Sequence, residues 1–259
     1  MNIVVLVKQV PDTWAERKLN EGDKTLDRAS VDVVMNEIDE YGVEEALRIK
    51  EAQGGEVTIL TMGPDRAVET IRKALSMGAD KAVHLSDEAL KGSDAVQTSY
   101  ALAKVLETLE YDLVIVGSEA TDSRMAIMGA LLSERLGQPQ LTGARKVTAE
   151  AGRVTIERQT DDGYAVVTAS TPAIISVVEK INEPRYPSFK GIMAAKSKPL
   201  TTLSVGDAGV DAGQVGLAAA PSQVVEFSNK PPRQAGQIVK DEGDGGAKIA
   251  EFLASQKFV

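Results

Sequence analysis

The chain has 259 residues, of which 43% are hydrophobic and 4% aromatic, enough for one sizeable core with an appendage beyond it. Its formal net charge of -9 argues against a nucleic-acid-binding protein, because no positive field would attract a polyanion. The sequence has no cysteine and one histidine, His84, so it has neither a thiol nucleophile nor a multi-histidine metal site. Any redox role must therefore rest on a bound cofactor.

Through about residue 140, short β-branched apolar runs alternate with stretches of helical period, which is the pattern of strands joined by crossover helices. We expect strands at residues 2–7, 56–62, 81–85 and 112–117. We expect helices at residues 37–52, 65–76, 94–109 and about 124–136, the first of them with Asn36 as its N-cap. The pattern predicts an α/β fold.

From about residue 145 the period changes to alternation around Gly152 and residues 161–163, which predicts antiparallel β-hairpins. After Lys198, glycines and prolines separate short apolar pieces, and this composition predicts an extended C-terminal arm. A last helix, Gly245 to Gln256, places apolar side chains on one side and needs a surface to cover them. We therefore divide the chain into an α/β domain, residues 1–198, and an arm, residues 199–259.

The apolar run at the N-terminus, residues 3–7, is too short for a signal sequence, and it is expected to be the first strand. No segment approaches the roughly 20 apolar residues that span a bilayer. We expect a soluble, cytoplasmic protein.

The loop that begins at Gly117, after a predicted strand, is the best candidate for a nucleotide phosphate site. Glycine lets backbone amides approach an anion, and the N-terminus of the following helix favours negative charge. A glycine that merely turns the chain is an equally good explanation. The sequence has neither a Walker loop nor a full Gly-x-Gly-x-x-Gly fingerprint, which disfavours the usual kinase and dehydrogenase interpretations.

Three other features have competing interpretations. Asp39, Glu40, Glu44 and Glu45 have helical spacing, so a solvated helix face is favoured over an acid–base or metal site. His84 is expected to be a hydrogen-bonded structural residue. Trp14 follows Pro-Asp-Thr in a predicted loop, where it either covers a cofactor or subunit face or simply packs.

The segment from Asn182 to Met193 combines prolines with apolar and basic side chains, which suits a partner-docking loop. The alternative is a loop-to-helix junction whose apolar residues return to the core.

The motifs of this chain, in their order and spacing, closely resemble the electron transfer flavoprotein beta family over nearly the whole sequence. They are residues 7–12 (Val-Lys-Gln-Val-Pro-Asp), Asn36 with residues 44–47, Gly63-Pro64, residues 74–80, residues 157–163, residues 171–176 and residues 182–187. The resemblance implies a Rossmann-like domain in a heterodimer, whose alpha subunit holds most of the electron-transferring FAD and is wrapped by the C-terminal arm of this chain.

The resemblance also implies that this subunit binds AMP structurally and performs no catalysis of its own. The implied cofactor-binding residues are Leu6, Asn36, Glu37, Ile38, Asp39, Met62, Gly117, Ser118, Glu119, Ala120, Thr121, Asp122, Ser123, Arg124, Met125, Ala126, Ile127 and Met128. The chain departs from the family motifs at two places, so the ligand of this site stays open between AMP and a second FAD. AMP-binding members usually have Gly-Gln where this chain has Gly129-Ala130. Members with a second FAD usually have an Asp-Gly-Asp-Thr-type run where this chain has Asp-Ser-Arg-Met at residues 122–125.

By the same resemblance, a loop around Phe189 docks acyl-CoA dehydrogenases, as in fatty acid oxidation, or other flavin dehydrogenases, and electrons leave to a membrane-linked quinone oxidoreductase. Phe189 occupies an anchor position where leucine is familiar. The implied docking residues are Arg185, Tyr186, Phe189, Ile192 and Met193. The alternatives are a beta subunit that holds a second FAD in a bifurcating complex, and a free-standing α/β domain that binds or hydrolyses an adenine nucleotide.

Overall fold

A nine-stranded sheet organises the chain, which a computed structural model describes over residues 1–233, 236 and 238–258. The strands are β1 (Ile3–Leu6), β2 (Gln9–Pro11), β3 (Val33–Met35), β4 (Val57–Met62), β5 (Lys81–Leu85), β6 (Leu113–Gly117), β7 (Gln140–Glu150), β8 (Arg153–Thr160), β9 (Gly163–Ser170), β10 (Ala173–Val177) and β11 (Leu200–Leu203). The large sheet has the order β11-β5-β4-β1-β6-β10-β7-β8-β9, and β2 pairs with β3 separately.

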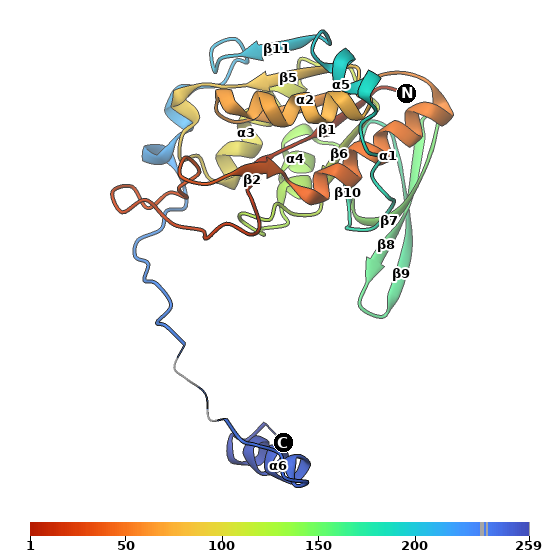
Figure 1. Ribbon diagram of the computed structural model, residues 1–259. Coiled ribbons are helices and arrows are strands. Elements are labelled where there is room, and N and C mark those ends of the chain that lie inside the picture. Colours follow the sequence, from red (N-terminus) through yellow and green to blue (C-terminus); the bar gives the residue numbers. More distant parts are fainter. Residues whose placement is uncertain (234–235, 237, 259) are drawn as a thin grey trace. The chain divides into compact units, whose positions relative to one another are not determined.

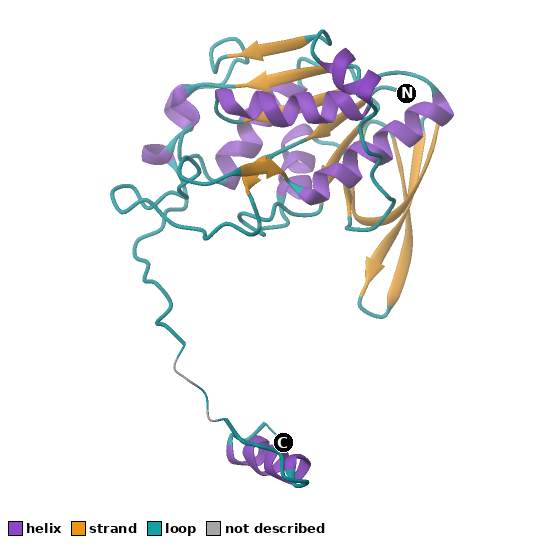
Figure 2. Ribbon diagram, viewed as in Figure 1, coloured by secondary structure: helices purple, strands orange, loops and turns teal. Residues whose placement is uncertain are grey.

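The pairing within this sheet changes at β7. From β11 to β7 all neighbours are parallel, whereas β7, β8 and β9 pair antiparallel. Figure 2 shows the β8–β9 hairpin projecting beyond the helices. The predicted α/β fold with a Rossmann-like parallel sheet and hairpin additions is confirmed.

Helices cover both faces of the parallel part (Figure 1). The helices of this unit are α1 (Glu37–Gln53), α2 (Val68–Met77), α3 (Ala95–Leu106), α4 (Met128–Leu136) and α5 (Phe189–Ala195), whereas α6 (Gly245–Ser255) belongs to a separate unit. The 3₁₀ turns are η1 (Asp65–Ala67), η2 (Glu88–Leu90), η3 (Ala212–Gln214) and η4 (Leu217–Ala219). The sheet divides the hydrophobic core into two clusters, one on each face. Ile3 and Val5 of β1 pack with α1 and α2 on one face, and Val4 and Leu6 pack with α3 and α4 on the other. Every residue of β1 is buried, as in a central parallel strand.

One helix starts later than predicted. We expected it from about residue 124, but α4 begins at Met128. Arg124 and Ala126 have φ angles of 50° and 53°, in the left-handed region that a right-handed helix excludes. Residues 118–127 therefore form a long loop between β6 and α4.

The domain boundary expected at residue 198 falls inside the sheet-containing unit. Residues Leu200–Leu203 form β11, which pairs in parallel with the edge strand β5, and this unit extends to Val225. The second unit begins at Glu226 and contains α6, whose Ile249 and Phe252 side chains are exposed. None of the helices in the described residues is long and apolar enough to cross a membrane.

Candidate functional site

The carboxyl ends of β1, β4 and β6 meet where the strand order of the sheet reverses. The chain runs from β1 through α1 to β4 on one side, whereas β6 lies on the other side of β1. In open parallel sheets this reversal point is where ligands bind. The predicted cofactor-binding residues gather here, because Leu6, Met62 and Gly117 end the three strands and residues 36–39 start α1.

Asn36 joins the start of α1 to the loop after β6. It occupies the N-cap position, as expected, but its side chain accepts no hydrogen bond from the amides of α1. Instead its Nδ2 donates to Asp39 Oδ1 at 2.9 Å and to the Glu119 carbonyl at 3.0 Å, and its Oδ1 accepts from the Thr121 amide at 3.0 Å. The fully buried Asn36 therefore fixes the loop to the helix.

Asp39 explains why β6 ends in a glycine. A Cβ on Gly117 would lie 2.4 Å from Asp39 Oδ1, much closer than atoms can approach. The other carboxylate oxygen, Oδ2, accepts from the Lys8 amide at 2.8 Å. Burial raises the pKa of Asp39 to about 7, against the opposing effects of Asn36 and Lys8. Gly117 thus has a structural reason that is independent of any ligand.

Asp122 lies at the centre of a buried ionic network. Its carboxylate accepts from Lys8 Nζ at 2.9 Å and from Arg28 Nη2 at 2.5 Å. The Asp122 side chain has no exposed surface, while those of Lys8 and Arg28 are 40% and 37% exposed. Burial alone would raise the pKa of Asp122, but the two cations outweigh it and hold that pKa below its ordinary value.

Sequence reasoning missed Lys8 and Arg28 as members of this site. They lie 114 and 94 residues from Asp122 along the chain, and Arg28 belongs to the excursion between β2 and β3. No local pattern indicates such a pair. The nearest signal is Lys8 itself, within the Val-Lys-Gln-Val-Pro-Asp motif that follows β1.

Two buried polar atoms near Asp122 have no hydrogen-bond partner among the described residues, namely Arg28 Nη1 and Thr121 Oγ1. A guanidinium N–H is a donor, and a hydroxyl both donates and accepts. Buried groups of this kind normally have partners, so their position next to Asp122 fits an additional oxygen-rich group. A phosphate or a ribose hydroxyl of a nucleotide has that chemistry.

The rest of the loop is open to solvent. Met125 and Ile127 are exposed, and Arg124 is an exposed side chain that contacts Glu119 Oε1 at 3.4 Å. The loop leads into the N-terminus of α4, where free amides and the helix dipole favour an anion.

The predicted docking residues lie on and just before α5. Tyr186 and Phe189 are 96% and 80% exposed, and Ile192 and Met193 are about half exposed. Ser188 caps the helix, since its Oγ accepts from the Gly191 amide at 3.0 Å. These apolar side chains face solvent, whereas the alternative of a simple junction required them to return to the core.

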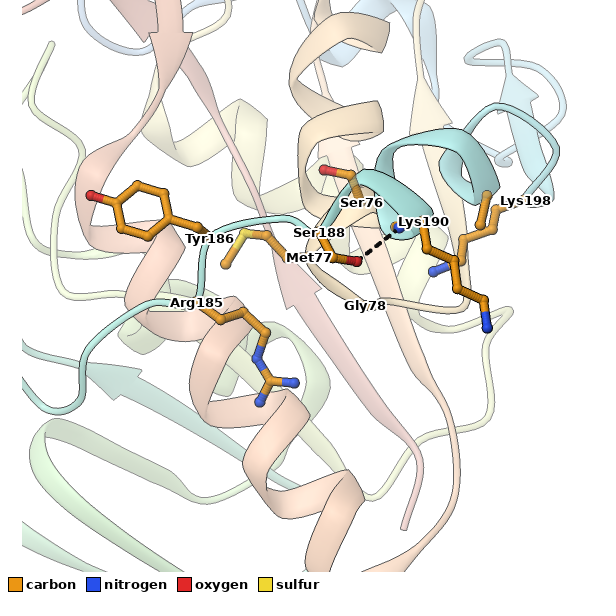
Figure 3. Close-up of a pocket in the computed structure, with 10 residues that line it drawn as sticks. Ser76, Met77, Gly78, Arg185, Tyr186, Ser188, Lys190 and Lys198 are labelled. Carbon is orange, nitrogen blue, oxygen red and sulfur yellow. Dashed lines mark hydrogen bonds between the residues drawn. The ribbon is translucent and has the colours of Figure 1, made fainter.

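Arg185 differs from the other predicted docking residues because its charge is paired within the chain. Its guanidinium bonds both oxygens of Glu44 and both oxygens of Glu51. Figure 3 shows the Arg185 side chain directed at α1, while the Tyr186 ring points away from it.

The carboxylates of α1 correct an expectation. We predicted a solvated face for Asp39, Glu40, Glu44 and Glu45, but only Glu40 is not buried. Glu44 and Glu45 are covered by a distant segment, whose Asn182 Nδ2 donates to Glu45 Oε2 at 3.1 Å. Helical spacing does not reveal such cover, because it comes from the tertiary fold.

The expectations for His84 and Trp14 have different outcomes. His84 is buried in β5, its Nε2 lies 3.0 Å from the Gly63 carbonyl, and burial lowers its pKa, consistent with the expected structural role. Trp14 is 96% exposed, so it packs against nothing in the described residues.

Known proteins with similar sequences are electron transfer flavoprotein beta subunits and a subunit of a caffeyl-CoA reductase-Etf complex. The family model for the electron transfer flavoprotein domain matches residues 23–208. The chain is 55% identical to electron transfer flavoprotein subunit beta of Mycobacterium tuberculosis, over 100% of this chain and 99% of that relative. The relative of the same name from Thermoanaerobacterium thermosaccharolyticum is 41% identical over 92% of each chain. The caffeyl-CoA reductase-Etf complex subunit CarD of Acetobacterium woodii is 37% identical, also over 92% of each.

Proposed function

Because the chain belongs to the electron transfer flavoprotein family, as a beta-type subunit, we propose that it helps to carry electrons from flavin dehydrogenases to a membrane-linked quinone oxidoreductase. A beta subunit implies an alpha-subunit partner. Acyl-CoA dehydrogenases are the proposed donors. The chain itself supplies binding surfaces, and the FAD held mostly by the alpha subunit carries the electrons.

The observation that carries the proposal is the exposed apolar surface of Tyr186, Phe189, Ile192 and Met193. A complex that must form and dissociate repeatedly needs a small surface with a few apolar anchors. Burying Phe189 against a dehydrogenase would contribute about 1.5–3 kcal/mol. The docked donor would then bring its flavin within electron-transfer distance of the FAD.

The second part of the proposal is that AMP binds at the carboxyl ends of β1 and β6. The unpartnered Arg28 Nη1 and Thr121 Oγ1 support an oxygen-rich ligand there, and Lys8 and Arg28 supply positive charge beside the loop. AMP would have a structural role. The same groups would also accept the pyrophosphate of a second FAD, which is the alternative occupant.

The third part concerns residues 226–259, which we propose wrap the alpha subunit. In α6 the Ile249 and Phe252 side chains are 62% and 56% exposed, and no residue of α6 is buried. An amphipathic helix with no covered face gains stability by packing on a partner.

The test of this function is the cofactor content of the complex formed when this chain is co-expressed with its alpha subunit. One FAD and one AMP per heterodimer is the expected result, and two FAD without AMP would identify the second-FAD alternative. If the free chain turned over ATP and no flavin-containing complex formed, the carrier function would be wrong and an adenine-nucleotide hydrolase would be favoured. In the complex, Phe189→Ala should slow reduction by an acyl-CoA dehydrogenase without releasing flavin.

A further inference from the structure

The docking segment, defined here as residues 182–198, is attached to the α/β unit by the packing of α5 on α2, where Ala195 joins the core, and by polar contacts. Its helix α5 has only seven residues, and Ala195 is the one residue of α5 that is buried. So short a helix is not stable alone in water, because nucleating a helical turn is unfavourable. A hollow of about 370 Å³ lies between this segment and the end of α2 (Figure 3). Apolar packing alone therefore does not fix the orientation of the segment.

We propose that Arg185 is a positioning residue, which holds the docking segment on α1 in the orientation that a donor dehydrogenase meets, and is not itself a contact for that donor. The inference rests on the docking function proposed above. It deepens that function, because it assigns the orientation of the apolar surface to one arginine and two carboxylates.

The geometry of Arg185 supports this role. Its Nε and Nη2 donate to the two oxygens of Glu44 at 2.7 and 3.1 Å, and its Nη1 and Nη2 donate to the two oxygens of Glu51 at 2.5 and 3.2 Å. A guanidinium has five N–H groups, so these four bonds leave about one N–H for anything else. The planar fork of arginine suits this double grip, and the ammonium of lysine does not.

Glu44, the buried one of the two carboxylates, is itself fixed. The Glu44 side chain is only 5% exposed and also accepts from Arg48 Nε at 3.1 Å. The Arg185 amide donates to Glu44 Oε2 as well, at 3.2 Å, so both backbone and side chain of Arg185 are held. The Tyr186 side chain, which follows directly, is 96% exposed. The Arg185–Glu44 ion pair therefore fixes the backbone directly before Tyr186, the first exposed residue of the apolar surface.

Other anchors hold the two ends of the segment. At its start, Asn182 Nδ2 donates to the Tyr41 carbonyl at 3.0 Å. At its end, Arg72 Nη1 donates to the carbonyls of Ala195 and Lys198 at 2.7 and 2.9 Å. Lys198 Nζ donates in turn to two carbonyls at the end of α2. Between these ends, Arg185 makes the side-chain ion pairs nearest to Tyr186 and Phe189.

The experiment uses the flavin-loaded heterodimer, reduced by an acyl-CoA dehydrogenase in the presence of its acyl-CoA substrate. We expect Arg185→Gln to raise the KM of the dehydrogenase for the heterodimer by about tenfold, with kcat changed by less than about twofold, because a disordered segment must be ordered on each encounter. Amide hydrogen exchange across residues 186–194 should become about tenfold faster. The flavin content should stay the same.

Three variants separate positioning from other roles. Arg153→Gln breaks the exposed ion pair with Glu150 at the turn between β7 and β8 and is the matched control, so its KM and exchange rates should equal those of the wild type. Glu51→Gln loses only the exposed half of the grip and should raise KM by about two- to threefold. Arg185→Lys keeps the charge but cannot make the double grip, so it should raise KM and speed exchange in the same direction as Arg185→Gln, whereas a direct charge contact with the donor would be retained by lysine.

Several results would overturn the inference. An Arg185→Lys heterodimer that keeps the wild-type KM although exchange of residues 186–194 is faster would make the charge of Arg185 a direct contact. Unchanged exchange in Arg185→Gln would show that Arg185 orders nothing. If Phe189→Ala raises KM and Arg185→Gln does not, positioning is wrong but docking stands. If neither variant raises KM, docking itself is wrong and the inference falls with it. If Arg185→Gln fails to fold, Glu51→Gln decides by the same two measurements.

Discussion

The buried carboxylate of Asp122 offers the sharpest test of how the candidate nucleotide site is held together. Asp122→Asn keeps the size of the side chain but removes its charge and replaces one acceptor oxygen with an NH₂ donor. Removing one partner of a fully buried ion pair costs about 3–5 kcal/mol. Lys8 and Arg28 are 40% and 37% exposed, so water recovers part of that loss for both cations. We expect the free energy of unfolding to fall by about 2–3 kcal/mol.

Thermal unfolding of the purified heterodimer measures this effect. For units of about this size each kcal/mol lowers Tm by about 2–4 °C, so Asp122→Asn should lower it by about 4–12 °C. The matched control is Glu56→Gln, which breaks the 2.7 Å ion pair with Lys81 between two half-exposed side chains and should cost less than about 0.5 kcal/mol. A Tm for Asp122→Asn within about 1 °C of the wild type would refute the network as a source of stability.

Two further predictions concern the contact between Gly117 and Asp39. Gly117→Ala would place a methyl group 2.4 Å from the Asp39 carboxylate, and it should lower the free energy of unfolding, measured in urea, by about 1–3 kcal/mol. In the control Gly129→Ala the new Cβ lies 3.6 Å from its nearest neighbours, so this variant should be neutral or slightly stabilising. Equal effects of the two variants would contradict the steric argument. The folded-state pKa of Asp39, about 7, lies above its ordinary value of 3.8, so its contribution to stability is complete below about pH 3.8 and is lost as pH rises through about 7. Between these pH values, deprotonation of Asp39 should lower the free energy of unfolding by up to about 1.4 kcal/mol per pH unit. Asp39→Asn should remove this pH dependence. If the variant kept it, the dependence would belong to another group.

The sheet was largely predictable from the sequence because burial leaves a local signal there. The four predicted parallel strands match β1, β4, β5 and β6 to within about one residue at each end, since a strand buried on both faces is a continuous apolar run. The start of α4 was not predictable in this way. Its delay depends on positive φ angles at Arg124 and Ala126, which neither residue type indicates.

The candidate sites were predictable as positions but not as contacts. The strand pattern placed Gly117 at the carboxyl end of β6, whereas Leu6 was named through the family resemblance; the two lie at one edge of the sheet because β1 and β6 are parallel. What no local pattern contained was the pairing of Asp122 with Arg28, or of Glu44 with Arg185, which lies 141 residues away. Such pairs arise only when the fold brings distant segments together.

The buried carboxyl groups of Asp39 and Glu44 on α1 have pKa values shifted in opposite directions, because their hydrogen-bond and charge partners differ. Burial raises the pKa of Asp39 to about 7, since the hydrogen bonds from Asn36 and the Lys8 amide compensate only in part. Burial also opposes ionisation of Glu44, yet the hydrogen bonds and charge of Arg185 hold its pKa below the ordinary value. Near neutral pH, Asp39 is therefore divided between its two protonation states while Glu44 stays ionised. A moderate change of pH should thus alter the charge at the N-terminal end of α1 and leave the ion pairs between Arg185 and α1 intact.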